Sequence, residues 1–368
     1  MKNGQRAKNI IEHCEKYPKL KLQDLFKFLY QSAFGCEHMI SSLERATEYI
    51  KRESLENEEK KRETLTSDYI SSNLIQPLNG NYSRVDLDYL KQGLTAETFG
   101  ALFYLSAKKE ENGLFCLQED LELCMHLIEE KLLPFSLEEY INNIEEWKNL
   151  GYPAIHHSPA FREEYHPSYR VISNEFIPFL PLFAKIDCAL KKGNVHMAIE
   201  GGSASGKSTL CTLIEKVYTN ICVFHTDDFF LRPDQRTTKR LNEIGGNLDR
   251  ERFLEEVLIP LKKGERVNYR AYDCYTQTIL DPAVKTPQKL TVTEGAYSLH
   301  PDLEKYYNLK IFLDVDKETQ RARILKRNSP AFAKRFFEEW IPLEEKYFTT
   351  FNIKEKCDLV IKITEENF

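Results

Sequence analysis

Hydrophobic residues recur at helical spacing through the first part of the chain. Leu22, Leu25, Phe26 and Leu29 share one face of a predicted helix. Further helices are predicted at 43–61, 101–108, 117–131 and 136–150, the last opening on a capping box of Ser136 and Glu139. Alternation of apolar and polar residues, the pattern of a strand, is scarce before residue 190. We therefore expect an all-helical domain over residues 1–190.

From Val195 onward, short apolar runs alternate with helical segments. The expected strands are 195–199, 221–225, 290–293, 309–313 and 358–363. Continuous apolar runs separated by helices are typical of a buried parallel sheet. A segment rich in proline and aromatic residues, 151–181, and a predicted helix at 181–191 precede them. The domain boundary is therefore expected near 191–194, with an α/β domain over 191–368.

Composition agrees with two folded domains. The chain has 368 residues, more than one hydrophobic core usually serves, and 42% of them are hydrophobic. Its 51 Lys and Arg against 57 Asp and Glu give a net charge of −6. A broad basic surface is therefore not expected, and neither is a nucleic-acid partner.

The compartment is expected to be the cytoplasm. No apolar run reaches the length of about 18 residues that spans a bilayer, so no membrane segment is expected. The first residues lack the apolar core of a secretory signal. Nine scattered cysteines without a CxxC pair indicate reduced thiols rather than a disulfide framework. The oligomeric state cannot be read from the sequence.

The segment 201–208 reads Gly-Gly-Ser-Ala-Ser-Gly-Lys-Ser and fits the phosphate-binding pattern G-x-x-x-x-G-K-[ST]. It lies between a predicted strand and a predicted helix, which is the context that the pattern requires. Small residues let backbone N–H groups point at phosphates, Lys207 supplies a cation, and Ser208 offers a hydroxyl to Mg²⁺. The expected nucleotide-binding residues are Gly201, Gly202, Ser203, Ala204, Ser205, Gly206, Lys207, Ser208 and Thr209.

Two carboxylates, Asp227 and Asp228, follow the second predicted strand. Open α/β sheets bind ligands at the carboxyl ends of their strands. A small-molecule kinase needs a carboxylate there to accept the proton of the attacking hydroxyl. A helix cap or a solvated turn is the structural alternative, and the phosphate-binding loop one helix upstream favours the catalytic interpretation.

For other charged residues, the sequence indicates a functional role less specifically. Glu294 ends the third predicted strand, where it either orients Mg²⁺, binds substrate or faces solvent. Arg323 and Arg327 lie on a basic helical face after the fourth strand. They either neutralise charge on a transferred phosphoryl group or form a solvated face.

These motifs make residues 195–365 resemble the uridine kinase and phosphoribulokinase-like family of P-loop kinases, with nicotinamide riboside kinase as a close relative. The loop is nearly that of uridine kinases, and His-Thr-Asp-Asp-Phe-Phe at 225–230 resembles the Gln-Asp-Asp-Phe-Phe of the riboside kinases. The resemblance implies a P-loop NTPase-type parallel sheet with flanking helices, here preceded by a mostly α-helical domain.

The resemblance also implies roles for single residues. Asp227 matches the position of the family's general base, and Glu294 matches that of a residue that binds Mg²⁺ or substrate. Asp249 falls on a ribose-binding aspartate, although the sequence that follows equally suits a helix N-cap. Tyr272 falls on a tyrosine that contacts the base, and the two arginines fall on the lid helix.

Three departures concern the acceptor. Gln277 stands where uridine kinases present a histidine to the base, and Ile324 replaces a lid arginine. Asn-Ser-Pro-Ala-Phe at 328–332 replaces the Arg-Gly-rich tip of the lid. Uridine itself is therefore in doubt as the acceptor.

The helical half has no recognisable activity. Cys36, Glu37 and His38 are metal-ligating types, but adjacent residues on a helix point in different directions. His156, His157 and His166 lie in the loop rich in proline and aromatic residues. They either line a second ligand site or belong to a packed linker.

The sequence therefore predicts an ATP- or GTP-dependent, Mg²⁺-dependent kinase that phosphorylates a hydroxyl of a nucleoside or sugar-like small molecule. Asp227, Lys207 and Arg327 are the expected catalytic residues. The alternative is a nucleotide-binding switch whose helical half binds a protein partner.

Overall fold

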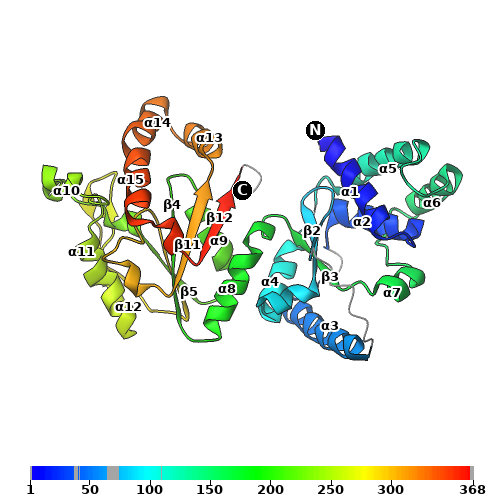
Figure 1. Ribbon diagram of the computed structural model, residues 1–368, viewed down its shortest axis with the longest axis horizontal. Helices are drawn as coiled ribbons and strands as arrows, with labels where there is room; N and C mark the ends of the chain where they lie inside the picture. The colour runs from blue at the N-terminus through cyan, green and yellow to red at the C-terminus, as the bar shows by residue number, and fades with distance from the viewer. Residues whose placement is uncertain (1, 37–39, 41, 64–73, 109, 365–368) are drawn as a thin grey trace. The chain divides into compact units, whose positions relative to one another are not determined.

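The computed structural model describes residues 2–36, 40, 42–63, 74–108 and 110–364 (Figure 1). The chain divides into two compact units, Met1–Leu180 and Pro181–Phe368. This division is N-terminal to the boundary expected near 191–194, because helix α8 (Leu180–Leu190) packs with the second unit. Its Asp187 Oδ1 accepts a hydrogen bond of 2.9 Å from the hydroxyl of Tyr218, at the end of α9.

The first unit is mostly helical, as expected. Its helices are α1 (Lys2–Lys16), α2 (Leu22–Phe34), α3 (Leu43–Glu63), α4 (Ala96–Ser106), α5 (Gly113–Glu129), α6 (Leu137–Asn149) and α7 (Pro159–Tyr165). Ser136 caps α6 by accepting a hydrogen bond of 3.4 Å from the backbone N–H of Glu139. The interior is strongly aromatic, and Phe28, Phe99 and Tyr140 have no exposed surface.

The first unit also contains a three-stranded antiparallel sheet, so the expectation of an all-helical domain is wrong. Its strands are β1 (Ile75–Pro77), β2 (Tyr82–Asp86) and β3 (Tyr169–Ser173), in that spatial order. Each strand has at most five residues, and four of the five positions of β2 are buried. A strand that is buried on both faces has no polar alternation for the sequence to display.

The second unit is built on a five-stranded parallel sheet, which confirms the predicted α/β fold. Its strands are β4 (Val195–Gly201), β5 (Ile221–His225), β10 (Leu290–Glu294), β11 (Leu309–Val315) and β12 (Leu359–Ile363). All four pairings are parallel, in the order β12-β11-β4-β10-β5. The five strands match the five apolar runs of the sequence.

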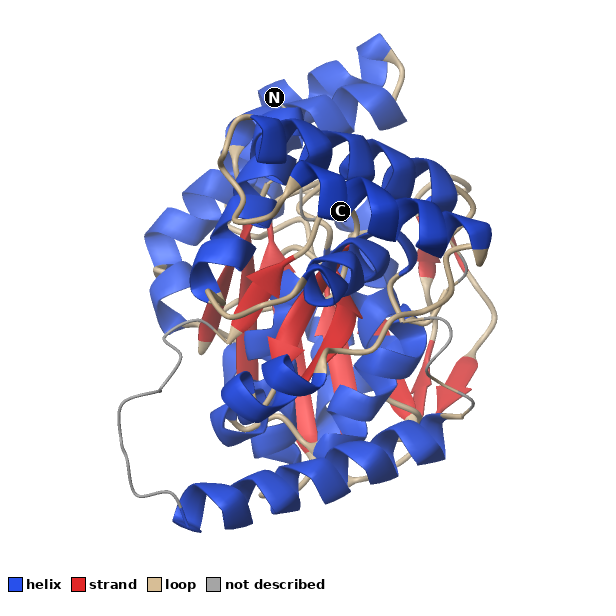
Figure 2. Ribbon diagram, turned by 90° about the vertical axis from the view of Figure 1, so that its right-hand side faces the viewer, coloured by secondary structure: helices blue, strands red, loops and turns tan. Residues whose placement is uncertain are grey.

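The second unit also contains helices, labelled in Figure 1 and drawn in blue in Figure 2. They are α8, α9 (Lys207–Val217), α10 (Thr238–Asn242), α11 (Arg250–Phe253), α12 (Ile259–Lys263), α13 (Lys317–Arg327), α14 (Pro330–Arg335) and α15 (Ile341–Phe351). Short hairpins of β6 (Val267–Tyr269) with β9 (Ala283–Lys285) and of β7 (Tyr272–Asp273) with β8 (Thr278–Ile279) lie between α12 and β10.

The register of the sheet brings three strand ends to the same level. Glu294, the last residue of β10, pairs with Ile199 of β4 on one side and with His225 of β5 on the other. Residues that follow these three positions in the sequence therefore emerge at one edge of the sheet. That edge is where the sequence places its charged motifs.

Candidate active site

The glycine-rich loop connects β4 to α9, as predicted. Gly201 has a φ of +152°, and a Cβ atom there would lie 2.7 Å from the carbonyl oxygen of Leu313 on β11. Only glycine accommodates both the backbone conformation and this close approach. The loop then ends at the N-terminus of α9, where unpaired N–H groups and the helix dipole favour an anion.

Lys207 is the first residue of α9, and its ammonium group lies over the loop. Nζ donates to the carbonyl oxygens of Gly201 at 2.9 Å and Gly202 at 3.0 Å. These bonds hold the cation beside the backbone that is expected to surround the phosphates. The neighbouring Ser208 donates its hydroxyl to Oε1 of Glu294 at 3.1 Å.

Glu294 connects this loop to the next strand. Its Oε1 also lies 2.7 Å from Nδ1 of His225, at the end of β5. Burial acts to raise the pKa of Glu294, but the hydrogen bond with His225 and the charge of Lys207 outweigh it, so that the pKa is lowered. The same hydrogen bond raises the pKa of His225. The carboxylate is therefore ionised at neutral pH.

Asp227 and Asp228 follow β5 in a short 3₁₀ turn, Thr226–Phe229. Burial by the surrounding protein raises the pKa of Asp227; the charge of Lys207 opposes this shift and that of Glu294 adds to it. The side chain is nevertheless exposed to solvent, so it is accessible to a substrate. Because β10 lies between β4 and β5, the turn that carries Asp227 is two strands from the strand that leads into the loop.

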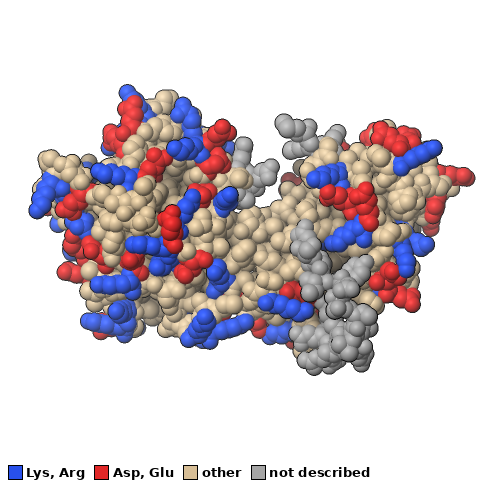
Figure 3. Space-filling view, in the orientation of Figure 1, with Lys and Arg blue, Asp and Glu red and all other residues tan. Residues whose placement is uncertain are grey.

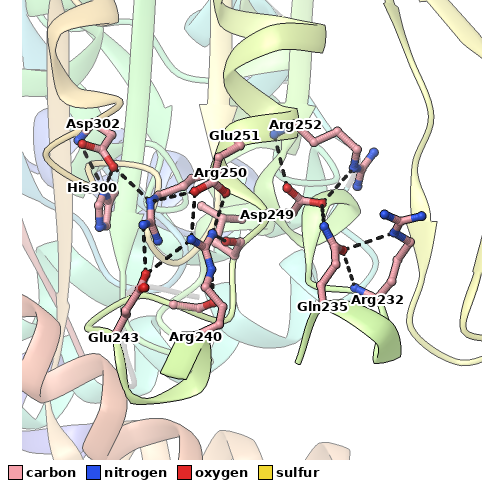
Figure 4. A network of polar contacts seen from close by, with 12 residues as sticks. Arg232, Gln235, Arg240, Glu243, Asp249, Arg250, Glu251, Arg252, His300 and Asp302 are labelled. Atoms are coloured by element: carbon pink, nitrogen blue, oxygen red, sulfur yellow. Dashed lines mark hydrogen bonds and ion pairs between the residues drawn. The ribbon is translucent and has the colours of Figure 1, made fainter. Parts of the chain in front are cut away.

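Asp249 is the N-cap of α11, which was one of its two expected roles. Its Oδ1 accepts from the backbone N–H of Arg252 at 3.2 Å, and its Oδ2 from Nε2 of Gln235 at 2.8 Å (Figure 4). The backbone N–H of Asp249 also donates to the carbonyl of Phe229 at 2.7 Å. Asp249 is thus buried beside the segment that carries Asp227, and its expected contact with a substrate stays a prediction.

Tyr272 lies on the β7–β8 hairpin and is buried. Its hydroxyl is 3.3 Å from a guanidinium nitrogen of Arg236. Burial raises the pKa of Cys274, on the same hairpin, and the negative charge of Asp227 contributes. This hairpin therefore lies near Asp227, and Tyr272 remains a predicted substrate contact.

The two arginines of α13 have different surroundings. Arg323 donates to the carbonyl oxygen of Ala204 in the loop at 3.3 Å. Arg327 is exposed and lies about 6 Å farther along the helix axis. The contact with the loop is thus made by Arg323, and the catalytic role expected of Arg327 stays a prediction.

Two residues that hold the loop were missed in the sequence. Glu344 of α15 accepts from the backbone N–H of Ser203 at 2.8 Å and from its hydroxyl at 2.6 Å. Gln320 of α13 donates to the carbonyl oxygen of Ser203 at 2.8 Å. Burial raises the pKa of Glu344, while Lys207 acts to lower it. No local motif marks Glu344, because it lies 141 residues from its partner.

A third missed residue is Glu200, the last residue but one of β4, which has no exposed surface. Its carboxylate accepts from the backbone N–H groups of Gly201 at 3.0 Å and Leu299 at 3.1 Å, and from the hydroxyl of Tyr347 at 3.1 Å. Burial raises its pKa to about 7. The group supports the start of the loop from inside the sheet.

The donor atoms at the loop fit a magnesium ion. Ser208 and Glu294 offer a hydroxyl and an ionised carboxylate, which are the hard oxygen ligands that Mg²⁺ binds together with phosphate oxygens. Among the described residues, no group of three or more His, Cys, Asp or Glu side chains is arranged to hold a metal ion.

The candidate residues of the first unit differ in their burial. Cys36 is buried, whereas Glu37 and His38 lie outside the described residues. His157 is buried in a polar cluster. His156 and His166 are exposed, and His166 ends α7 in a left-handed conformation with a φ of +43°.

Basic and acidic side chains are interspersed on the face of the molecule that Figure 3 shows. None of the described helices combines the length and the apolar character of a membrane span. All nine cysteines, each within the described ranges, are free thiols.

The model of the phosphoribulokinase/uridine kinase family matches residues 196–331, which confirms the resemblance for the C-terminal half. Uridine kinase-like protein 3 of Arabidopsis thaliana is 26% identical over 174 residues, which cover 41% of this chain and 37% of that protein. A uridine kinase of Clostridium perfringens (strain 13 / Type A) is 22% identical over 144 residues, 37% of this chain and 69% of that protein. The chain thus spans little more than a third of the Arabidopsis relative.

Two solved structures are also similar. A possible uridine kinase from Bacillus stearothermophilus has a TM-score of 0.38 and 20% identity, covering 49% of this chain and 98% of that one. A putative fructose transport system kinase from Silicibacter sp. TM1040 has a TM-score of 0.39 and 22% identity, covering 46% and 89%.

Proposed function

We propose that the protein is a phosphotransferase that transfers the γ-phosphoryl group of ATP or GTP to a hydroxyl group of a small molecule. The observation that carries this proposal is the arrangement at one edge of the sheet. The glycine-rich loop, Ser208 bonded to Glu294, and the solvent-exposed Asp227 all lie at the carboxyl ends of β4, β10 and β5. Such a set suits a reaction that depends on positioning and electrostatics.

Each residue then has a defined task. Backbone N–H groups of the loop and of the start of α9 bind the phosphates, and Lys207 neutralises charge on the group in transfer, with Arg323 as a second cation near the loop. Asp227 accepts the proton of the acceptor hydroxyl as its oxygen bonds to phosphorus. The bond from the γ-phosphorus to the β-phosphate oxygen breaks, and the nucleoside diphosphate leaves. Mg²⁺, held by Ser208 and Glu294, would balance the charge of the phosphate oxygens.

We propose a nucleoside or another sugar-like polyol as the acceptor. The names of the relatives support this class, and the two buried groups Asp249 and Tyr272 lie on the segments next to Asp227. Gln277, Ile324 and the altered segment 328–332 weigh against uridine itself. We further propose a cytoplasmic location, for which the nine free thiols are the support.

The experiment is a screen of nucleosides, sugars and vitamins for acceptor-dependent release of ADP or GDP by the full chain. We expect one small molecule to raise turnover at least about tenfold over the acceptor-free rate. A Lys207→Ala variant should lose this stimulation, because it lacks the cation over the loop. Stimulation by a protein partner alone would instead support the alternative, a nucleotide-binding switch.

A further inference from the structure

Arg84 belongs to the first unit and has no role in the proposed reaction. Its surroundings are unusual for a buried arginine. The residue belongs to β2 and is 3% exposed. Its guanidinium donates through Nε to Oε1 of Gln31 at 2.9 Å and through NH1 to Oε1 of Gln76 at 3.4 Å. Both acceptors are neutral amides. Within the described part of the chain, Arg84 forms no ion pair, so no anionic side chain balances its buried charge.

Two polar atoms beside it have no hydrogen-bond partner in the described structure. One is NH2 of Arg84 itself. The other is Nε2 of His13, a fully buried ring whose Nδ1 lies 2.9 Å from Nε2 of Gln76. Buried donors and acceptors are almost always paired, and an unpaired set in one place indicates a missing partner.

A second buried cation adds to this charge. Lys27 of α2 is 7% exposed, and its Nζ donates to the carbonyl oxygen of Ile155 at 3.1 Å. Burial together with the nearby Arg84 lowers the pKa of Lys27 to about 8, so it remains largely protonated at neutral pH. Burial and the same arginine also lower the pKa of His13.

Asp24, a buried carboxylate whose charge also acts on Lys27, is already engaged. Its oxygens accept from the backbone N–H groups of Lys21 at 3.0 Å and Ser158 at 2.9 Å, and from the hydroxyl of Ser158 at 2.7 Å. Nδ1 of His157 lies 3.1 Å from the same group. Asp24 therefore ties the segment before α7 to the start of α2 and has little capacity left for Arg84.

Desolvation of a guanidinium without a counter-ion is strongly unfavourable, and an anionic ligand would supply both the charge and the acceptor. The planar fork of arginine matches a carboxylate or a phosphate. The guanidinium also lies 4.7 Å from the ring centre of Tyr169 and 5.4 Å from that of Phe28, and these rings keep water away. Tyr169 and Gln76, which contact Arg84, are themselves only half-buried.

We propose that the first unit contains an oxyanion-binding site centred on Arg84, with Lys27 as a second cation, for the phosphate or carboxylate group of a small molecule. The site is independent of the glycine-rich loop and of the proposed kinase activity. His157 contributes indirectly, since its Nε2 lies 2.7 Å from the hydroxyl of Tyr169, which donates to Oε1 of Gln31 at 3.2 Å.

The test is a calorimetric titration of the full chain with inorganic phosphate and, separately, with succinate. It is made in a Lys207→Ala background, so that the loop does not contribute. We expect one of the two anions to bind at millimolar concentration or below, and Arg84→Gln to weaken that binding at least about tenfold, the equivalent of one charge-assisted hydrogen bond. The matched control is Arg52→Gln, because Arg52 is an exposed arginine of the same unit.

Binding of phosphate alone or of succinate alone identifies the group that the site takes. No binding of either anion, or equal binding after Arg84→Gln, would overturn the proposal. If Arg84→Gln fails to fold, Lys27→Met serves in its place and should weaken the same binding. A selenate soak of crystals of the unaltered chain needs no variant; it should give an anomalous peak beside Arg84, and a peak at the glycine-rich loop alone would count against the site.

Discussion

Glu200 and Asp227 are both carboxyl groups of the second unit whose pKa is raised, yet they differ in exposure. Glu200 is fully buried behind the loop, whereas Asp227 faces solvent. A buried carboxyl supports the loop and influences stability, and an exposed one is available to a substrate. From this difference in exposure, we expect Glu200 to stabilise the loop and Asp227 to contact a substrate.

The pKa of Glu200 makes stability depend on pH. Its folded-state value is about 7 against an ordinary value of 4.5, so between these values the folded chain keeps a proton that the unfolded chain has lost. The contribution of this group to the free energy of unfolding is therefore greatest below about pH 4.5 and falls as the pH rises to about 7. Glu200→Gln removes this dependence.

Denaturant unfolding of both chains at pH 5 and pH 8 tests this expectation. The unaltered chain should lose about 1–3 kcal/mol relative to the Glu200→Gln variant over that interval. A difference between the two chains that is the same at both pH values would show that Glu200 titrates normally.

Local sequence identifies a site residue only when its neighbours carry the signal. The loop residues 201–208 were predictable because one contiguous pattern specifies both the turn and the cation. Glu200 and Glu344 were not, because their partners come from distant elements such as α15. A carboxylate that binds a backbone N–H across the fold leaves no trace in the sequence around it.

At the scale of elements, α15 is expected to hold the glycine-rich loop. Glu344→Ala removes both hydrogen bonds to Ser203, so the backbone amide of Ser203 should exchange with solvent faster. ATP binding should weaken about tenfold, because hydrogen bonds to a charged group are worth roughly 1.5–3 kcal/mol. Hydrogen exchange and calorimetry measure the two effects.

The neighbouring Glu345→Gln is the matched control, since Glu345 is exposed and pairs with Lys317. It should leave the exchange of the Ser203 amide and ATP binding unchanged. Unaltered exchange in Glu344→Ala would mean that the loop keeps its shape without α15.

Element prediction succeeded where an element is long or continuously apolar. The five parallel strands were recognised because each is a buried apolar run between helices. The small antiparallel sheet was missed because its strands are short and one of them lies in the segment rich in proline and aromatic residues.

At the scale of the whole molecule, the second unit should fold by itself, with α8 as part of it. A fragment of residues 181–368 is expected to bind ATP within about threefold of the full chain, because it keeps the whole sheet and the Tyr218–Asp187 hydrogen bond. A fragment of 191–368 lacks α8 and should unfold at lower temperature. Thermal unfolding and ATP titration of the two fragments compare them directly.

Equal stability of the two fragments would place the functional boundary at the position first expected from the sequence, near 191–194. Failure of both to bind ATP would mean that the nucleotide site needs residues of the first unit.

The role of Asp227 as general base is tested most directly by steady-state kinetics with the acceptor that the screen identifies. Asp227→Asn should lower turnover at least about a hundredfold while the dissociation constant of ATP changes less than about threefold. Asp228→Asn, one residue along the same turn, should retain most of the activity. Full activity in Asp227→Asn, or an equal loss in the two variants, would contradict the account.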